Sequence, residues 1–477
     1  MRRVPYITRF VNWDLSQEFH VKMSIVTLVL ATLHAIGHLS GTFVFGSRPY
    51  RQDAVAALLG PEAVPRPYSA YISSRPGWTG LTALVSFYLL AVMSMPRIRK
   101  WSYEIFQLGH LLMFPFIAML MAHGSAALLQ FPALGIVLAF PTLMVVLERG
   151  TRLLLGFHRV PASLEILDDD TVCITATIPR LRLWQYRAGQ YVFIQVPQIS
   201  FFQWHPFTVS ECIGKDFKLH IKTDGDWTAK LRDLTDLKYI GVDGSYGAPA
   251  QRFYDFDQTI IIGSGIGVTP FSGILNDLQS REDHAWTRRR DSTSSHESDS
   301  EAPPPPIQRM PTIINHNKEI DLNLYRRVDF HWVIRDRVYL EWFSTLLNKI
   351  STGTHNPNLD IRMHNHVSKK RKDITTHVYR FLLEKHRTPA HPYSPLTGLI
   401  APTHFGRPDF PKIFAEHYEQ MSKLFARDKQ RKRRVGVFFC GAPIIGHQLA
   451  DLCHEMTLRG REDGSEIEYF FQIEVFG

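Results

Sequence analysis

The chain has 477 residues, of which 45% are hydrophobic, and its formal net charge at pH 7 is +9. The length argues against a single domain, and the hydrophobic residues concentrate in about the first 150 positions, which argues against a soluble protein. The charge does not indicate nucleic-acid binding, because the basic runs at 369–372 and 429–434 lack interleaved aromatic residues. A solvated surface or contact with anionic lipid is the favoured interpretation.

Four hydrophobic segments predict transmembrane helices at 21–45, 76–95, 105–123 and 128–148. No cleavable signal peptide is predicted before them. Arginine and lysine residues flank the ends that we assign to the cytosol, so both termini are predicted to be cytosolic. The loop at 46–75 carries arginines against this rule.

Two of these segments carry paired histidines at matched separations. His20 and His34 are about 21 Å of helical rise and about 40° of rotation apart, so the two rings share one helix face. His110 and His123 are separated by about 20 Å of rise, and Pro115 between them can kink or overwind the helix and align the rings. Histidine inside a membrane helix is unfavourable without a partner. The matched heights predict two haems with two axial histidines each: His20 with His110 on the inner side, and His34 with His123 on the outer side.

His38 follows His34 by one helical turn. It could polarise an oxygen molecule near the outer haem, or it could bond a loop carbonyl, and the sequence favours neither interpretation.

After Arg159 the pattern changes to short segments rich in β-forming residues. Residues 171–178 alternate in polarity, and 190–196 are typical of a buried strand. Several such segments with turn signals predict a small antiparallel barrel to about residue 250.

From Gln258 the pattern changes again, to strands alternating with helices. A buried strand at 259–262 leads into a glycine-rich turn at 263–271, where backbone amides can approach a pyrophosphate. Further strands at 330–336 and 435–441 predict a doubly wound sheet that binds its ligand at the C-terminal ends of the strands.

Residues 281–312 interrupt this sheet and have almost no apolar content, which predicts a disordered insertion. Ser292, Ser298 and Ser300 stand among charged residues there. Phosphorylation of these serines would change the local charge, so we also consider a regulatory role for the insertion.

The sequence therefore predicts a multi-domain protein with three consecutive parts. These are an α-helical transmembrane haem bundle at 1–152, an antiparallel β-barrel at 153–255, and an α/β doubly wound domain at 256–477.

Over nearly its full length the sequence resembles the NADPH oxidase family, the superoxide-producing flavocytochromes b of the ferric reductase superfamily. Besides the histidine pairs and a C-terminal aromatic residue, the resemblance rests on ordered motifs at His205–Thr208, Gly225–Thr228, Gly263–Phe271, His331–Asp336, Gly406–Pro408 and Cys440–Gly441. The insertions suggest a fungal member.

The resemblance implies a cytosolic ferredoxin-reductase-like module, with FAD in the barrel and NADPH in the α/β domain, in addition to two haem b groups. The implied flavin-side residues are His205, Pro206, Phe207, Thr208, Lys222, Trp227 and Thr228. The implied NADPH-side residues are Gly263, Gly265, Gly267, Thr269, Arg335, Arg407 and Gly441.

Several of these residues have particular roles by resemblance. Lys222 replaces the family's usual arginine near the FAD pyrophosphate, which keeps the charge but loses the bidentate fork. Arg335 and Arg407 would bind the 2′-phosphate of NADPH. Cys440 would flank the nicotinamide. Phe116 would lie between the haems, and Phe476 would cover the flavin until nicotinamide displaces it.

The sequence also departs from the family. The family has six spans, and this sequence matches from just before the third. The family's Cys-Gly-Pro reads Cys-Gly-Ala-Pro at 440–443, Asp-Gly-Pro-Phe-Gly reads Asp-Gly-Ser-Tyr-Gly at 243–247, and Gly477 follows the terminal aromatic residue.

The implied function is a multi-pass membrane NADPH oxidase that passes electrons from NADPH through FAD and two haems to dioxygen, with superoxide as product. Two alternatives stay open: a ferric-chelate reductase that uses the same electron path, and a shortened, non-catalytic or regulatory paralogue. Expected partners are the lipid membrane and regulatory cytosolic or membrane subunits, with no nucleic acid.

Overall fold

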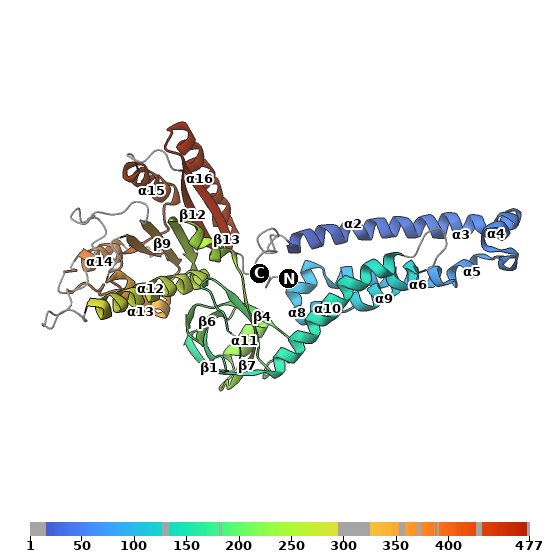
Figure 1. The fold of residues 1–477 in the computed structure, drawn as a ribbon, viewed down its shortest axis with the longest axis horizontal. Coiled ribbons are helices and arrows are strands. Elements are labelled where there is room, and N and C mark those ends of the chain that lie inside the picture. Colours follow the sequence, from blue (N-terminus) through green and yellow to red (C-terminus); the bar gives the residue numbers. More distant parts are fainter. Residues whose placement is uncertain are drawn as a thin grey trace. The chain divides into compact units, whose positions relative to one another are not determined.

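The structure is a computed structural model, and it describes residues 16–125, 133–180, 182, 184–293, 325–352, 358–369, 374–385, 387–388, 391–425 and 432–474. The chain divides into two compact units, one ending at Leu154 and the other beginning at Leu155. Figure 1 shows the helices of the first unit and the strands and helices of the second.

The first unit is helical. Its long helices are α2 (Ser16–Ile36), α6 (Arg75–Met93), α8 (Tyr103–His110), α9 (Met113–Gly124) and α10 (Ala133–Phe157). α2 continues through a π-helical segment, η1 (Gly37–Thr42), into α3 (Phe43–Gly46). The shorter elements between them are η2 (Pro49–Arg51), α4 (Gln52–Leu59), η3 (Pro61–Ala63), α5 (Tyr68–Ile72) and α7 (Pro96–Trp101).

Four stretches of this unit are long and apolar enough to cross a membrane: Glu18–Gly46, Arg75–Met93, Tyr103–Gly124 and Ala133–Thr151. The four predicted spans are therefore confirmed as helices, apart from residues 128–132 of the last one, which lie outside the described residues. Local sequence explains where two of them begin, because Ser74 and Ser102 each accept a hydrogen bond from a backbone N–H of the first helical turn.

The third span breaks after His110, where α8 ends. Pro115 has no N–H to donate to the carbonyl of Leu111, which accepts instead from Phe114 at 3.0 Å. This bond between residues three apart, with two more just before it, tightens the turn to 3₁₀ geometry and adds rotation per residue. The structure thus contains the overwinding that we expected between His110 and His123.

The second unit begins with a seven-stranded antiparallel sheet in the order β4-β3-β7-β1-β2-β6-β5. Its strands are β1 (Arg159–Asp168), β2 (Thr171–Thr177), β3 (Tyr191–Gln195), β4 (His205–Thr208), β5 (Glu211–Ile213), β6 (Asp216–Lys222) and β7 (Tyr239–Tyr246). Val172 and Ile174 of β2 are fully buried in the core of this sheet, and Trp227 and Leu231 of α11 (Asp226–Arg232) pack onto the same cluster.

A six-stranded parallel sheet follows, in the order β11-β10-β9-β8-β12-β13. Its strands are β8 (Gln258–Ser264), β9 (Arg326–Ile334), β10 (Leu359–Val367), β11 (Thr403–Phe405), β12 (Arg433–Cys440) and β13 (Ile467–Glu474). The predicted doubly wound sheet is confirmed, because separate apolar clusters lie on its two faces.

Helices and short turns surround this parallel sheet (Figure 1). The elements that contribute to one apolar cluster are η4 (Pro249–Asp255), η5 (Gly265–Val268), α12 (Thr269–Thr293), η6 (Arg337–Phe343) and α13 (Ser344–Ser351). Those that contribute to the other are α15 (Phe410–Leu424) and α16 (Pro443–Glu462). The remaining helix of this part is α14 (Ile374–Lys385).

The expectation of a disordered insertion from residue 281 is wrong for its first part. α12 continues to Thr293, so 281–293 is helical. Arg281 pairs with Asp277 one turn earlier at 2.8 Å, and the segment contains residues with good helix propensity, such as Arg, Glu and Ala. The rest of the insertion, at 294–312, lies outside the described residues.

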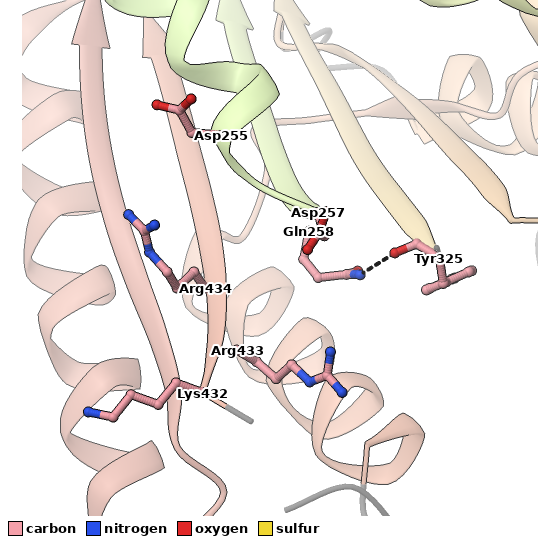
Figure 2. A pocket seen from close by; sticks show the side chains of 7 residues that line it. All are labelled: Asp255, Asp257, Gln258, Tyr325, Lys432, Arg433 and Arg434. Atoms are coloured by element: carbon pink, nitrogen blue, oxygen red, sulfur yellow. Dashed lines mark hydrogen bonds between the residues drawn. The ribbon is translucent and has the colours of Figure 1, made fainter. Parts of the chain in front are cut away.

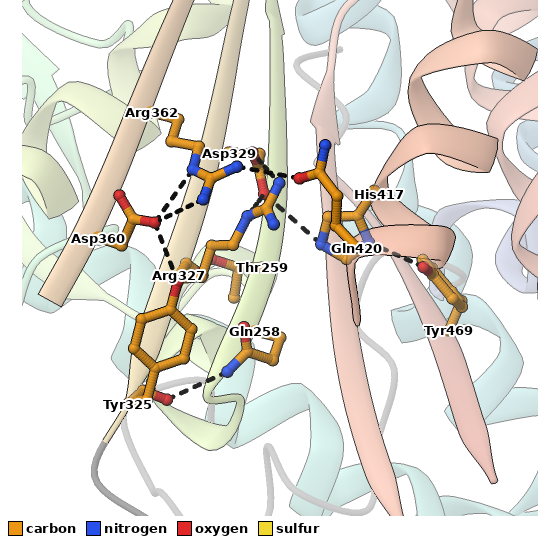
Figure 3. Close-up of polar contacts among 10 residues, drawn as sticks. All are labelled: Gln258, Thr259, Tyr325, Arg327, Asp329, Asp360, Arg362, His417, Gln420 and Tyr469. Atoms are coloured by element: carbon orange, nitrogen blue, oxygen red, sulfur yellow. Dashed lines mark hydrogen bonds and ion pairs between the residues drawn. The ribbon is translucent and has the colours of Figure 1, made fainter. Parts of the chain in front are cut away.

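The face of the parallel sheet beneath α15 is unusually polar (Figure 3). Arg327 and Asp329 pair along β9, and Asp360 on β10 pairs with Arg362 at 2.9 Å. His417 of α15 lies 3.5 Å from Asp329. Burial lowers the pKa of His417 to about 3, so its ring is neutral near pH 7 and this last contact is not an ion pair.

Candidate functional site

The four histidines of the membrane helices form two pairs. The ring centroids of His20 and His110 are 6.3 Å apart, and those of His34 and His123 are 6.2 Å apart. An iron with two axial imidazoles places their ring centroids about 6 Å apart, because a metal–nitrogen bond is about 2 Å long and the nitrogen lies about 1 Å from the ring centre. The predicted pairing is thus the pairing that the helices bring together, and its spacing fits a haem iron.

Residues of α6 contact the two histidines of the third span. The Nδ1 atom of His110 lies 3.1 Å from the hydroxyl of Ser94, just past the end of α6. The Nδ1 atom of His123 lies 2.8 Å from the backbone carbonyl of Pro76, in the first turn of α6. Sequence reasoning missed these contacts. The only sequence signal for them was the presence of a proline, glycines and a serine in or next to the apolar segment that forms α6.

Two further residues of this unit were expected near the haems. His38 lies in the π-helical segment, with its ring centroid 4.6 Å from that of His34. π-Helical turns often occur at functional sites, because they re-aim side chains within a helix. Phe116 of α9 packs against Phe87 of α6 with ring centroids 4.7 Å apart, and it lies between the two histidines along the third span.

The expected flavin-side motif forms β4. The ring of His205 lies against Trp227 at a tilt of 33°, with centroids 4.3 Å apart, and Phe207 stacks on the same indole at 5.9 Å. Burial lowers the pKa of His205 to about 4, so this ring is neutral. The hydroxyl of Thr208 and the indole Nε1 of Trp227 are buried without a hydrogen-bond partner among the described protein atoms, which fits a polar ligand such as flavin in this place.

Lys222 ends β6 and already has carboxylate neighbours. Its Nζ lies 2.8 Å from Asp224 and 4.0 Å from Asp170. The hydrogen bond to Asp224 is the main reason that the pKa of Lys222 is raised. A pyrophosphate at this position would have to compete with these carboxylates. Nearby, Thr228 accepts from the backbone N–H of Gly225 at 2.9 Å and so holds the turn into α11.

The glycine-rich turn connects β8 to α12 through η5. Gly265 has a φ of +57°, a left-handed conformation that favours glycine. A Cβ on Gly267 would lie 2.4 Å from the carbonyl oxygen of Cys440, so only glycine allows this approach to the end of β12. Cys440 is itself paired with Gly263 across the strands, and burial raises the pKa of its thiol.

The remaining expected nucleotide residues share this edge of the sheet. Thr269 is buried at the start of α12, and Gly441 follows Cys440. Val367 at the end of β10 pairs with the last residues of β9 and β11, so Arg335 and Arg407, which follow those strands, lie at the same edge. Both arginines are exposed.

A histidine cluster that sequence reasoning missed lies next to this edge. The rings of His331, His364, His366 and His404 stack at centroid distances of 4.9 to 5.5 Å across β9, β10 and β11. Two N–N contacts, of 3.2 and 3.3 Å, connect them in pairs. Within the described residues no group of side chains has the arrangement of a metal site.

One pocket opens at the opposite edge, where the strands begin (Figure 2). It is lined by Asp255, Asp257, Gln258, Tyr325, Lys432, Arg433 and Arg434. Parallel sheets of this kind bind ligands at the C-terminal ends of their strands, so we do not assign the nucleotide to this pocket. The expected flavin cover, Phe476, lies outside the described residues and stays a prediction.

Three domain families match consecutive parts of the chain. The "Ferric reductase like transmembrane component" matches residues 1–121, the "FAD-binding domain" matches 157–250, and the "Ferric reductase NAD binding domain" matches 256–454. Together with the four long apolar helices, these matches make the chain an integral, multi-pass membrane protein with FAD- and NAD(P)-binding domains. The expected fold class is confirmed.

Individual proteins are similar over the same span. "Probable respiratory burst oxidase homolog protein I" of Arabidopsis thaliana is 28% identical over 96% of this chain and 52% of its own length. A superoxide-generating NADPH oxidase heavy chain of Dictyostelium discoideum is 25% identical over 94% of this chain and 80% of its own length. A ferredoxin NADP+ reductase from Neisseria gonorrhoeae, solved with FAD and NADP, is 11% identical and covers 66% of this chain and 97% of its own, with a TM-score of 0.37.

The chain spans about half the length of the Arabidopsis protein. Neither of the two oxidase relatives is fungal, so a fungal origin stays a prediction.

Proposed function

We infer that this chain is a member of the ferric reductase and NADPH oxidase superfamily that carries electrons from NADPH through FAD and two b-type haems to dioxygen and so produces superoxide. Bound flavin would convert a hydride into single electrons, and two haems would let these cross the membrane one at a time. The Dictyostelium relative is described as superoxide-generating, which supports dioxygen as the acceptor.

The observation that carries the proposal is the spacing of the two histidine pairs, at 6.3 and 6.2 Å between ring centroids. Each pair leaves room for an iron, and its two imidazoles would hold that iron from both sides. An acceptor would then have no open coordination position, so it would be reduced without binding to iron. His38, next to His34, would donate a hydrogen bond to dioxygen at the outer side.

The cytosolic residues would bind and orient the two nucleotides. Thr208 and Trp227 offer the flavin a hydroxyl and an indole N–H that no described protein atom uses. Gly265 and Gly267 let the backbone approach the dinucleotide, and the two exposed arginines at the same edge suit a 2′-phosphate. Basic residues at the ends of the spans favour cytosolic termini, and the His20–His110 pair would then lie on the flavin side of the membrane.

Two measurements on the purified full chain test this proposal. A reduced-minus-oxidised spectrum is expected to report two b-type haems per chain, and NADPH is expected to drive cytochrome c reduction that superoxide dismutase suppresses. His34→Leu should remove one haem and abolish superoxide, while NADPH still reduces FAD. An unchanged haem content and an unchanged superoxide rate in this variant would contradict the pairing.

A second candidate is a ferric-chelate reductase, which two of the matching domain families favour by description. It would use the same histidines and nucleotide residues but bind chelated iron on the outer side. NADPH-dependent reduction of a ferric chelate that superoxide dismutase does not suppress would favour this candidate. A wild-type chain that binds neither haem nor FAD would instead indicate a non-catalytic paralogue.

A further inference from the structure

We propose that α6 is the positioning helix of the haem site, and that it turns the Nε2 atoms of His110 and His123 toward the irons. Ser94 would do this for the inner pair, and Pro76 together with Gly80 for the outer pair. The inference rests on the proposed haem ligation and assigns roles to residues that do not themselves touch the iron.

The contact of His123 with Pro76 determines which ring nitrogen carries the hydrogen. The Nδ1 atom lies 2.8 Å from the carbonyl oxygen of Pro76, and a carbonyl oxygen can only accept. Nδ1 therefore donates, and the lone pair that can bind a metal is on Nε2.

Gly80 makes room for this arrangement. A Cβ at Gly80 would lie 2.8 Å from both Cε1 and Nδ1 of the His123 ring, closer than carbon atoms approach in proteins. The ring thus lies directly on the backbone of α6, one turn beyond the carbonyl that it bonds. Any side chain at position 80 would push the ring out and break its hydrogen bond.

Ser94 does the same for His110 by a different route. Its hydroxyl oxygen lies 2.6 Å from the carbonyl of Leu90 and 3.1 Å from Nδ1 of His110. The Ser94 hydroxyl has one hydrogen. Two oxygen atoms approach to 2.6 Å only when a hydrogen lies between them, so Ser94 donates this hydrogen to the carbonyl of Leu90. The Ser94 oxygen must then accept from Nδ1–H, which again leaves the lone pair on Nε2.

Close packing brings α8 to this end of α6. A Cβ at Gly109, next to His110, would lie 2.5 Å from Cβ of Met93, the last residue of α6. Glycine at position 109 therefore lets the histidine reach Ser94. In contrast, His20 and His34 on α2 have no hydrogen-bond partner among residues 16–125 and 133–157, so α6 holds only one ligand of each pair.

A hydrogen bond from the outer nitrogen of a metal-bound imidazole fixes the ring plane and makes the ring a stronger donor to the metal. A stronger donor stabilises the oxidised iron and lowers its reduction potential. Removing the acceptor should therefore raise the potential of the affected haem, and a displaced ring should release that haem.

The test uses the purified full chain with Ser94→Ala and Gly80→Ala, followed by haem stoichiometry, a redox titration and electron paramagnetic resonance. Ser94→Ala should keep both haems, shift one of the two potentials upward and change the resonance of that haem alone. Ser94→Thr, which retains the hydroxyl, should restore the wild-type values. Gly80→Ala should lose about half of the haem, or change the other haem's resonance.

Matched controls separate positioning from general damage to the bundle. Gly135→Ala adds a Cβ to α10 that meets only one backbone oxygen, at 3.7 Å, and Thr82→Ala removes a hydroxyl that bonds only a carbonyl of its own helix. Both should leave potentials and resonances unchanged.

The outcomes also separate this inference from the proposed function. If the wild-type chain holds two haems and Ser94→Ala and Gly80→Ala match it in all three measurements, the positioning role is overturned and the proposed function stands. Equal shifts of both haems in Ser94→Ala would also overturn it. A wild-type chain without haem would overturn both.

Discussion

Arg327 and Asp329 form a two-point ion pair inside the parallel sheet, with Nε 2.6 Å from Oδ2 and Nη2 2.8 Å from Oδ1. The two side chains are only 5% and 8% exposed. Burial by itself would raise the pKa of the Asp329 carboxyl, but the Arg327 guanidinium offsets this and keeps the pKa well below its usual range. His417, whose Nε2 atom lies 3.5 Å from Asp329, has a neutral ring and so offers neither partner a compensating charge.

Asp329→Ala should therefore destabilise the parallel sheet strongly, because it leaves the Arg327 guanidinium buried without its partner. Breaking one side of such a pair removes about 3–5 kcal/mol from the free energy of unfolding. Thermal unfolding of the full chain in detergent, followed by FAD release, measures this loss. The control is Asp236→Ala, whose ion pair with Lys238 is exposed and should contribute less than about 1 kcal/mol. Similar melting of the two variants would contradict the prediction.

The histidine cluster beside the nucleotide edge predicts sensitivity to acid. Burial lowers the pKa of His364 to about 4 and that of His366 to about 3, from a usual value of 6.5. Below pH 6.5 these histidines therefore bind protons in the unfolded chain but not in the folded chain. Their contribution to the free energy of unfolding is fully present above pH 6.5 and falls as the pH is lowered toward 4. At pH 5 each of these histidines should have lost about 2 kcal/mol of stabilisation.

His364→Phe tests this, because it keeps a stacked ring and removes the titration. The free energy of unfolding of this variant should fall less steeply between pH 7 and pH 5 than that of the wild type. His454→Phe, at an exposed position of α16, serves as the control and should keep the wild-type slope. Arg362 and Asp360 on the same face are unchanged in all three proteins. Parallel slopes for wild type and His364→Phe would refute the assignment.

The sequence predicted what depends on local spacing. Helical periodicity relates His20 to His34, and the missing N–H of Pro115 explains the tightened turn before His123. β10 was missed because five of its nine residues are polar, although the apolar residues Leu359, Ile361, Met363 and Val367 lie at alternate positions. They form a strand through pairing with β9 and β11, where charges and imidazoles find partners across the strands. The contacts of Ser94 and Gly80 depend on the distance between two helices, which no single segment of sequence contains.

The hydroxyl of Thr208 predicts a polar contact with the flavin. It is buried without a described protein partner, so replacing it with a methyl group should not harm the protein itself. Thr208→Val should weaken FAD binding by about 10-fold or more, the effect of losing one buried hydrogen bond. Titration of FAD into flavin-depleted full chain measures this. Thr177→Val, which removes an exposed hydroxyl bonded to Asp216, should leave the affinity unchanged. Wild-type affinity together with raised stability in Thr208→Val would show that flavin does not use this hydroxyl.

The two arginines at the C-terminal edge of the sheet predict selectivity for NADPH over NADH. Arg335 and Arg407 follow strands that end side by side with β10, and two guanidinium groups suit the two negative charges of a 2′-phosphate. Each charge-assisted hydrogen bond contributes about 1.5–3 kcal/mol, so the double alanine variant should lose about 100-fold or more in kcat/KM for NADPH.

NADH lacks this phosphate, so its kcat/KM should change by less than about 3-fold in the same variant. NAD(P)H-dependent reduction of ferricyanide by the flavin measures both constants without depending on the haems. The control is Arg252→Ala combined with Arg461→Ala, which removes two exposed arginines that pair with Asp255 and Glu468. This control should preserve the preference for NADPH. A general weakening of the domain lowers kcat/KM for both nucleotides alike, whereas loss of a phosphate contact lowers it for NADPH alone. Equal losses of kcat/KM with NADPH and NADH in the test variant would therefore place the 2′-phosphate elsewhere.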